Sequence, residues 1–260
     1  MALIQSTATL LELMPGRDLH LGLGTSGRAL VEKFHGIPFD RPVTRLSEVL
    51  GIVDTAFATG RLPGPGAVFS TESVALRLPA SRASLKLFVA GLGGRTLQVA
   101  GSSADGWLPI WPSSRGFPQM LDTVRAAAAE AGRPRPLVAA YVYGVVSAEP
   151  RMVDRVRASL AWYVAANGTA YRRLFTDYGY GDEVAEICAR WASGDRVGAA
   201  HGIPAEMLAD CTLTGDTPAF LAGATRLRHL GIDVPVLRFP TRITADECVD
   251  MVTRLGGASR

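Results

Sequence analysis

An apolar segment at residues 19–23, LHLGL, ends in a run of small and polar residues. Thr25 and Ser26 follow it closely, and a polar stretch containing Glu32 and His35 comes next. A buried parallel strand that ends at small residues beside a polar loop is how an α/β barrel builds a site at the carboxyl ends of its strands. The segment therefore favours a parallel α/β fold.

Further strand-like and helix-like segments alternate along most of the chain. The predicted strands are residues 19–23, 85–90, 104–110, 137–146 and 234–239. The predicted helices are residues 2–14, 41–58, 96–103, 118–131, 218–230 and 245–255, with a glycine-interrupted helical region at 152–210 and a loop at 60–70. This alternation predicts a parallel sheet with right-handed crossovers. A length of 260 residues suits one large domain over residues 1–260.

Charge and cysteine content exclude several functional classes. The net charge is only +3, and no basic cluster interleaves with aromatic residues, which argues against nucleic-acid binding. The three cysteines, Cys188, Cys211 and Cys248, form no CxxC pair and are expected to be free thiols in a reducing cytoplasm. His201 and His229 have no partner at ligand spacing, so we expect no metal site. The sequence shows no secretion signal and no apolar run near the roughly 18 residues of a membrane span.

A glycine-rich turn follows the predicted strand at 85–90. Its residues are Ala90, Gly91, Leu92, Gly93, Gly94, Arg95 and Thr96. Glycines let a backbone approach a phosphate closely, and the N–H groups and dipole of a helix N-terminus favour an anion. Arg95 could add a bidentate contact. An ordinary tight turn explains the same residues, so spacing alone leaves phosphate binding open.

Two other stretches hold candidate functional side chains. His35 follows Glu32 by three residues, and an imidazole beside a carboxylate could act as an acid or a base. A surface histidine without a catalytic role is the alternative. In the stretch 104–111, ADGWLPIW, Trp107 or Trp111 could line an apolar pocket or simply belong to the core. Asp105, in the same stretch, is expected to pair with neighbouring groups.

Three segments resemble the luciferase-like monooxygenase superfamily, and in particular its actinobacterial branch that uses coenzyme F-420. The branch shows an LGLG-x-SG strand followed by VEGWHG-hP-h-x-RP, where h is apolar. Here residues 21–27 read LGLGTSG and residues 31–42 read VEKFHGIPFDRP, with Lys33 and Phe34 in place of the usual Gly and Trp. Residues 104–109, ADGWLP, match the ADGW-h-P strand of the family.

The resemblance implies a TIM-barrel-like β/α fold that is incomplete. In the family, the LGLG strand is the fourth strand, whereas here only one predicted helix precedes it. The first three strands of the family barrel have no counterpart, so the chain resembles about three quarters of the family domain. The missing part normally supplies one wall of the flavin pocket.

The resemblance also implies a function. It suggests an oxidoreductase that exchanges hydride with a small organic or natural-product-like metabolite through F-420. FMN is the less favoured cofactor. One alternative is a cofactor-independent descendant whose apolar cavity binds or cyclises a secondary-metabolite substrate. Another is a non-catalytic flavoprotein remnant that serves as a binding or subunit-interaction protein.

Residue roles follow from the same resemblance. Ala90, Gly91, Gly93, Gly94, Arg95 and Thr96 would hold the cofactor phosphate. Thr25 and Ser26 would approach the cofactor ring, and His35 or Glu32 would transfer the proton. Phe34, Trp107 and Trp111 would line the substrate pocket.

The missing strands bear on assembly. Apolar parallel strands are normally covered, so strands at the open ends of the sheet need a neighbour. Pairing with another chain, or covering by the helical region at 152–210, would provide it. We expect a homodimer, or a separate chain that supplies the missing strands. The helical segment at 152–166, with Val156, Leu160 and Val164 on one face, is the candidate interface.

Overall fold

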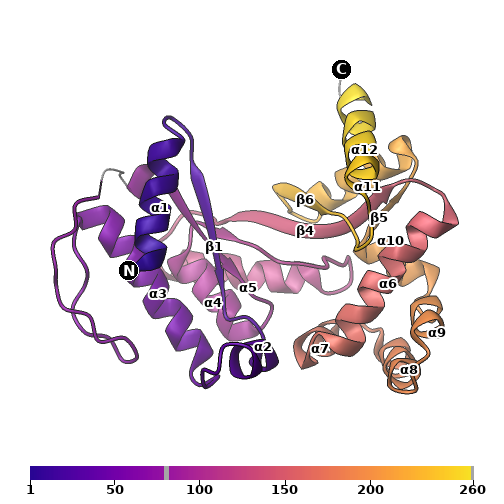
Figure 1. The fold of residues 1–260 in the computed structure, drawn as a ribbon, viewed down its shortest axis with the longest axis horizontal. Helices are drawn as coiled ribbons and strands as arrows, with labels where there is room; N and C mark the ends of the chain where they lie inside the picture. The colour runs from indigo at the N-terminus through magenta and orange to yellow at the C-terminus, as the bar shows by residue number, and fades with distance from the viewer. Residues whose placement is uncertain (79–81, 259–260) are drawn as a thin grey trace. The chain divides into compact units, whose positions relative to one another are not determined.

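A computed structural model of the protein describes residues 1–78 and 82–258. Within it the chain forms two compact units. Unit 1 comprises Met1–Leu108 and Asp122–Leu137, and unit 2 comprises Pro109–Leu121 and Val138–Arg260. The assignment of one domain to residues 1–260 stays a prediction. The order of the elements can be followed by colour in Figure 1.

Unit 1 contains three parallel strands with helices between them (Figure 1). Its elements are α1 (Ala2–Leu13), β1 (Leu19–Gly24), α2 (Arg28–Lys33), α3 (Pro42–Thr59), the 3-10 turn η1 (Arg82–Ser84), β2 (Leu85–Ala90), α4 (Gly94–Ser103) and β3 (Gly106–Trp107). Helix α5 (Phe117–Glu130) starts in unit 2 and ends in unit 1. Strand β1 pairs with β2 along its full length, from Leu19 opposite Leu85 to Gly24 opposite Ala90. Strand β2 pairs in turn with β3.

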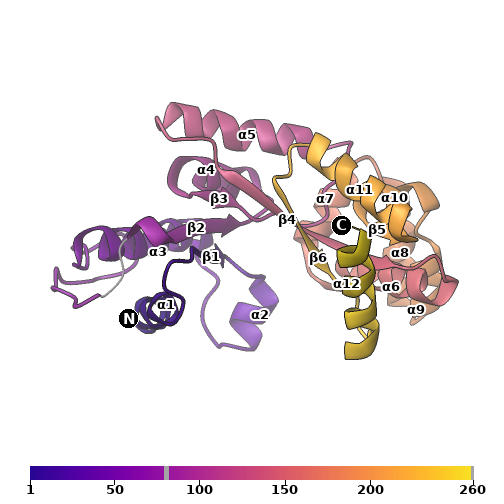
Figure 2. The ribbon, with the colours of Figure 1, turned by 90° about the horizontal axis from the view of Figure 1, so that it is seen from above.

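The two faces of this sheet differ in burial. Leu85, Leu87 and Val89 of β2 are fully buried, and α3 and α4 pack on this strand. The alternate residue His20 of β1 is exposed and stacks on Phe88 of β2, with ring centroids 5.0 Å apart. Figure 2 shows α4 lying between β2 and the part of α5 that belongs to unit 1. Side chains alternate across a strand, so Leu85, Leu87 and Val89 point into the core, and His20 and Phe88 lie on the opposite face.

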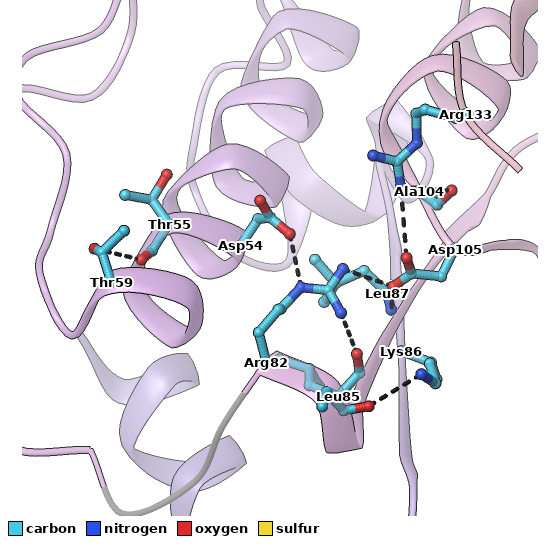
Figure 3. Close-up of polar contacts among 11 residues, drawn as sticks. Asp54, Thr55, Thr59, Arg82, Leu85, Lys86, Leu87, Ala104, Asp105 and Arg133 are labelled. Atoms are coloured by element: carbon cyan, nitrogen blue, oxygen red, sulfur yellow. Dashed lines mark hydrogen bonds and ion pairs between the residues drawn. The ribbon is translucent and has the colours of Figure 1, made fainter. Parts of the chain in front are cut away.

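An ionic network joins α3 to the starts of β2 and β3 (Figure 3). Arg82 contacts Asp54 and Asp105, each at 2.7 Å, and Arg133 contacts Asp105 at 3.4 Å. Asp105 also accepts the backbone N–H of Leu87 at 2.8 Å. Burial opposes the charge of Arg82, but hydrogen bonds to Asp54 and Asp105 raise its pKa overall. The expectation that Asp105 pairs with neighbouring groups is confirmed.

Unit 2 combines a second set of parallel strands with a block of helices. Its elements are β4 (Leu137–Val146), α6 (Pro150–Ala166), α7 (Thr169–Asp177), α8 (Gly181–Ala192), α9 (Arg196–His201), α10 (Ala205–Cys211), β5 (Leu213–Gly215), α11 (Thr217–His229), β6 (Val234–Arg238) and α12 (Ala245–Ala258). Strand β4 pairs with β6 from Ala139 to Tyr143 and with β5 from Gly144 to Val146. Across both described ranges, no helix has the length and apolarity to cross a membrane.

The candidate interface on α6 is wrong. Val156, Leu160 and Val164 are 0% exposed within the chain itself, where α6 packs against α7, α8 and α9. The apolar periodicity of the segment correctly predicts a face that must be buried. It cannot tell whether another chain or this chain covers that face. A dimer stays a prediction, but it cannot use these side chains.

The observed elements correct the sequence analysis at three points. A six-residue helix, α2, occupies part of the stretch predicted as a polar loop. The predicted strand at 104–110 is shortened to the two residues of β3, because Pro109 has no N–H to extend the ladder. The three-residue strand β5 was missed, which brings the described strands to six. The parallel α/β architecture is confirmed, with fewer strands than the eight of a closed β/α barrel.

Candidate functional site

The predicted site segments meet at the carboxyl ends of β1 and β2. Gly24 ends β1 opposite Ala90, which ends β2. A Cβ atom on Gly24 would lie only 2.9 Å from the carbonyl oxygen of Ala90, so glycine is needed for this approach. The structure therefore brings Thr25 and Ser26, which follow β1, close to the glycine turn that follows β2. These strand ends are where α/β barrels carry functional residues.

Two buried side chains shape the glycine turn. The Thr96 hydroxyl donates to the carbonyl oxygen of Gly93 at 2.7 Å, and the indole N–H of Trp107 donates to that of Gly91 at 2.9 Å. A Cβ atom on Gly91 would lie 2.5 Å from the Thr96 hydroxyl oxygen, so Gly91 makes room for Thr96. Trp107 is fully buried. Thr96 and Trp107 thus position the turn, and their predicted contacts with cofactor and substrate stay predictions.

The tip of the turn is open. Gly93 precedes the first residue of α4, and both Gly93 and Gly94 are exposed. A Cβ atom on Gly94 would meet nothing within 4 Å. The Arg95 side chain is exposed and has no hydrogen bond or ion pair to any residue in the described part of the chain. Backbone N–H groups at a helix N-terminus and a free guanidinium are what a phosphate group requires.

Ser26 adds a strained position beside the turn. Its φ angle is 56°, in the left-handed region that residues other than glycine rarely adopt. Its side chain is exposed, and its carbonyl oxygen accepts a 3.2 Å hydrogen bond from the Thr25 hydroxyl. Such backbone conformations cluster at ligand-binding sites. The position is compatible with the predicted role of Thr25 and Ser26 beside a cofactor ring.

The structure does not join His35 to Glu32. The Glu32 carboxylate accepts hydrogen bonds from Arg28 at 2.6 Å and from the backbone N–H of Phe39 at 3.2 Å. The Glu32 side chain therefore stabilises the position of the segment that follows α2. His35 is exposed and packs edge-on against Phe34, which is itself 78% exposed. The catalytic roles of His35 and Glu32, and the pocket role of Phe34, stay predictions.

Trp111 belongs to unit 2 and lies in an aromatic cluster. It is fully buried and stacks on Tyr143, with ring centroids 4.6 Å apart and planes 6° apart. Tyr163 and Phe175 pack around the same indole ring. The structure thus places Trp107 in unit 1 and Trp111 in unit 2. The pocket role of Trp111 stays a prediction.

A hollow of about 440 Å³ in unit 1 lies away from the glycine turn. It is lined by residues at the starts of the strands, including Asp18, Lys86 and Asp105. Lys86 and Asp18 form a 4.0 Å ion pair there. In α/β barrels the amino ends of the strands serve stability, whereas the carboxyl ends carry function. We therefore place the candidate site at the glycine turn.

A group of tyrosines beside Arg238 was not among the predicted site residues. Arg238 ends β6 opposite Tyr143, and its guanidinium lies 5.4 Å from the centroid of the Tyr143 ring. An arginine at the carboxyl end of a predicted strand was the available signal. The tyrosine partners come from β4, α6 and α7, so spacing along the chain could not reveal them.

The chain is similar in sequence to several known proteins. The family model described as luciferase-like monooxygenase matches residues 1–233. A phthiodiolone/phenolphthiodiolone dimycocerosates ketoreductase of Mycobacterium kansasii is 31% identical over 194 residues, which cover 70% of this chain and 52% of that protein. A Mycobacterium tuberculosis protein named as a putative coenzyme F-420-dependent oxidoreductase is 27% identical over 240 residues, which cover 83% of this chain and 68% of that one. The chain thus spans about half the length of the ketoreductase.

The fold is shared with solved structures. The coenzyme F-420-dependent tetrahydromethanopterin reductase of Methanopyrus kandleri superposes with a TM-score of 0.74 at 18% identity. The match covers 90% of this chain and 71% of that chain. At this identity the likeness shows the fold alone. It confirms a TIM-barrel-like α/β architecture, of which this chain carries a parallel half-barrel.

Proposed function

This chain belongs to the luciferase-like monooxygenase family, a family of enzymes, and on that premise we propose that it is an oxidoreductase that uses coenzyme F-420. FMN is the second choice. The Mycobacterium tuberculosis relative supports F-420, because it is similar over 83% of this chain and its name specifies that cofactor. The observation that carries the proposal is the open glycine turn with Arg95, whose side chain has no hydrogen bond or ion pair to a described residue.

The residues at the turn fit the phosphate of such a cofactor. Gly93 and Gly94 would let the phosphate approach the backbone at the start of α4, and Arg95 would pair with its charge. Thr25 and Ser26 would lie beside the ring, and Gly91 keeps the turn in shape. When bound, the cofactor supplies the hydride. The protein orients it, and His35 would move the accompanying proton.

The substrate is a carbonyl-containing organic metabolite in this proposal. The ketoreductase of Mycobacterium kansasii supports this class, since its name describes reduction of a ketone. In unit 2, Tyr143 and Tyr163 pack with each other and with Trp111 in a cluster of aromatic rings that carries hydroxyl groups. Sites for organic ligands are lined mostly by apolar and aromatic side chains with a few polar groups.

Cofactor titration of two matched pairs of variants tests the proposal. Binding of F-420 and of FMN is measured separately by the change in cofactor absorbance. Gly93→Asp should abolish binding, because it puts a carboxylate beside the phosphate. Gly93→Asn has nearly the same size without the charge and should bind measurably. A Cβ atom at this position meets only the Thr96 hydroxyl oxygen, at 3.9 Å, so both variants should fold.

Arg95→Ala completes the test. We expect a loss of about 1.5–3 kcal/mol in binding free energy, the range for a hydrogen bond to a charged group. Arg77→Ala changes another exposed arginine without a described partner and should leave affinity unchanged. If Gly93→Asp and Arg95→Ala both bind like the parent, the phosphate assignment fails. If the parent binds neither F-420 nor FMN, the cofactor-independent alternative takes its place.

A further inference from the structure

Arg238 presents an uncompensated charge at the carboxyl end of β6. Its guanidinium carbon lies 5.4 Å from the ring centroid of Tyr143 and 6.0 Å from that of Tyr141. Its side chain is exposed and makes no hydrogen bond or ion pair to any described residue. By contrast, many other exposed arginines of unit 2 form ion pairs with carboxylates, for example Arg190 with Glu186 at 2.6 Å. A guanidinium held over aromatic rings keeps its five N–H donors available to a ligand.

The hydroxyl groups of Tyr143 and of its neighbour Tyr163 are poorly hydrogen-bonded. The hydroxyl oxygens of Tyr143 and Tyr163 lie 3.5 Å apart, beyond the 2.5–3.0 Å range of O–H···O hydrogen bonds. Both side chains are more than nine-tenths buried, at 5% and 7% exposure. Buried hydroxyls nearly always have a well-formed partner. The geometry therefore leaves the Tyr143 and Tyr163 hydroxyls with a poorly formed hydrogen bond to each other, which a ligand acceptor could replace.

The Tyr143 hydroxyl is a hydrogen-bond donor at neutral pH. Burial, reinforced by the nearby Tyr163 hydroxyl, raises the pKa of Tyr143 well above its ordinary value. Burial also raises the pKa of Tyr171, on the adjoining helix α7, to about 12. Tyr143 and Tyr171 are thus neutral phenols, and the guanidinium of Arg238 lies over the Tyr143 ring. A ligand that satisfies all of them must supply acceptors and a negative charge.

The surroundings favour a flat apolar body behind that charge. Trp111 stacks on the Tyr143 ring, and Tyr171 packs edge-on against Tyr163 at 4.7 Å. The indole N–H of Trp111 is buried without a partner among the described residues. Tyr141 and Tyr171 are only partly buried, so their rings offer contact area. Aromatic rings pack well against other aromatic rings in stacked or edge-to-face arrangements.

We propose that Arg238, with the hydroxyl groups of Tyr143 and Tyr163, binds the carboxylate of an aromatic carboxylic acid. A planar carboxylate matches the fork of a guanidinium and accepts further hydrogen bonds from phenols. Tyr143 and Arg238 lie opposite each other near the carboxyl ends of β4 and β6, the end of such strands that carries substrates. The identification of this ligand as the substrate rests on the proposed oxidoreductase function, whereas its binding does not.

Calorimetric titration of the full chain with benzoate and benzamide tests the proposal. The two probes have the same ring and similar shape, but only benzoate carries a charge. Benzoate should bind at least about tenfold more tightly, as a charged hydrogen bond implies. Arg238→Met should remove this preference and leave benzamide binding unchanged, which also shows that the variant is folded. Arg238→Lys should retain part of the preference, and Tyr143→Phe should weaken benzoate binding severalfold.

Arg228→Met is the matched control, because Arg228 is an exposed arginine of α11 without a described partner. It should bind both probes like the parent. Equal affinity for benzoate and benzamide in the parent would overturn the proposal, and so would a preference for benzoate that survives in Arg238→Met. No cofactor is present in these titrations. Failure here therefore leaves the Gly93 and Arg95 result standing, and failure of cofactor binding leaves the benzoate result standing.

Discussion

His35 and Glu32 lie three residues apart, yet the structure gives them different surroundings. Glu32 is engaged by Arg28 and by the backbone N–H of Phe39. The imidazole of His35 is exposed and has no hydrogen-bond partner within the described ranges. At the residue scale, only His35 is free to exchange a proton with a bound substrate, and Glu32 would act by holding the segment in place.

This difference predicts distinct effects of substitution. His35→Ala should lower turnover by roughly 100-fold, the usual effect of removing a general acid or base. Glu32→Gln should have a smaller effect, because the amide can still accept from Phe39. The rate is followed by cofactor absorbance with a ketone substrate. His229→Ala, which alters an exposed histidine of α11, is the control. Full activity of His35→Ala would exclude His35 as the proton-transfer group.

At the scale of elements, glycines decide how closely α4 packs against α5. A Cβ atom on Gly101 would lie 2.2 Å from the carbonyl oxygen of Val124 and 2.7 Å from the Cβ atom of Ala127. The backbone of α5 cannot move away from such a contact unless α4 and α5 separate. Gly51, inside α3, is the opposite case, since a Cβ atom there would meet nothing within 4 Å.

Alanine at these two positions should therefore change stability in opposite directions. Gly101→Ala should lower the free energy of unfolding by about 1–3 kcal/mol, the usual cost of overpacking. Gly51→Ala should raise it by about 0.5–1 kcal/mol, because alanine loses less conformational entropy in a helix. Urea unfolding of the parent and both variants measures the two values. If Gly101→Ala is as stable as the parent, the close packing of α4 on α5 is wrong.

At the scale of the whole molecule, unit 1 leaves one strand with a single neighbour. In the ranges that the structure describes, β1 pairs only with β2. Exposed apolar side chains occur in the segments on either side of β1, among them Leu13 at 72%, Leu30 at 51% and Phe34 at 78%. An unpaired edge beside exposed apolar residues is prone to association. We expect a second copy of the chain, or a separate chain, to cover it.

Light scattering at several concentrations tests this expectation. The parent should have twice the mass of one chain, and Leu30→Glu combined with Phe34→Glu should shift it toward the monomer. Val197→Glu places the same charge on α9 of unit 2, where the native side chain is 67% exposed, and should leave the mass unchanged. A parent that stays monomeric at every concentration would contradict self-association through this surface.

Local sequence patterns were sufficient to predict the fold class and most of the longer elements. Residues 85–90 and 137–146 were predicted as strands and are β2 and β4 with the same bounds. Periodicity and glycine turns are local properties, so they also located the turn at 90–96 and the buried face of α6. Short elements such as α2 and β5 were not predicted, because a few residues show too little periodicity to be distinguished from a loop.

Which polar groups remain available became clear from the packed chain. Thr96 and Trp107 use their polar groups to hold the turn, whereas Arg95 and Arg238 make no hydrogen bond or ion pair to the described residues. The tertiary structure also showed that this chain covers its own α6 face. Each of these facts depends on contacts between segments far apart in sequence. Burial and hydrogen-bond satisfaction are properties of the packed chain, and residue spacing does not encode them.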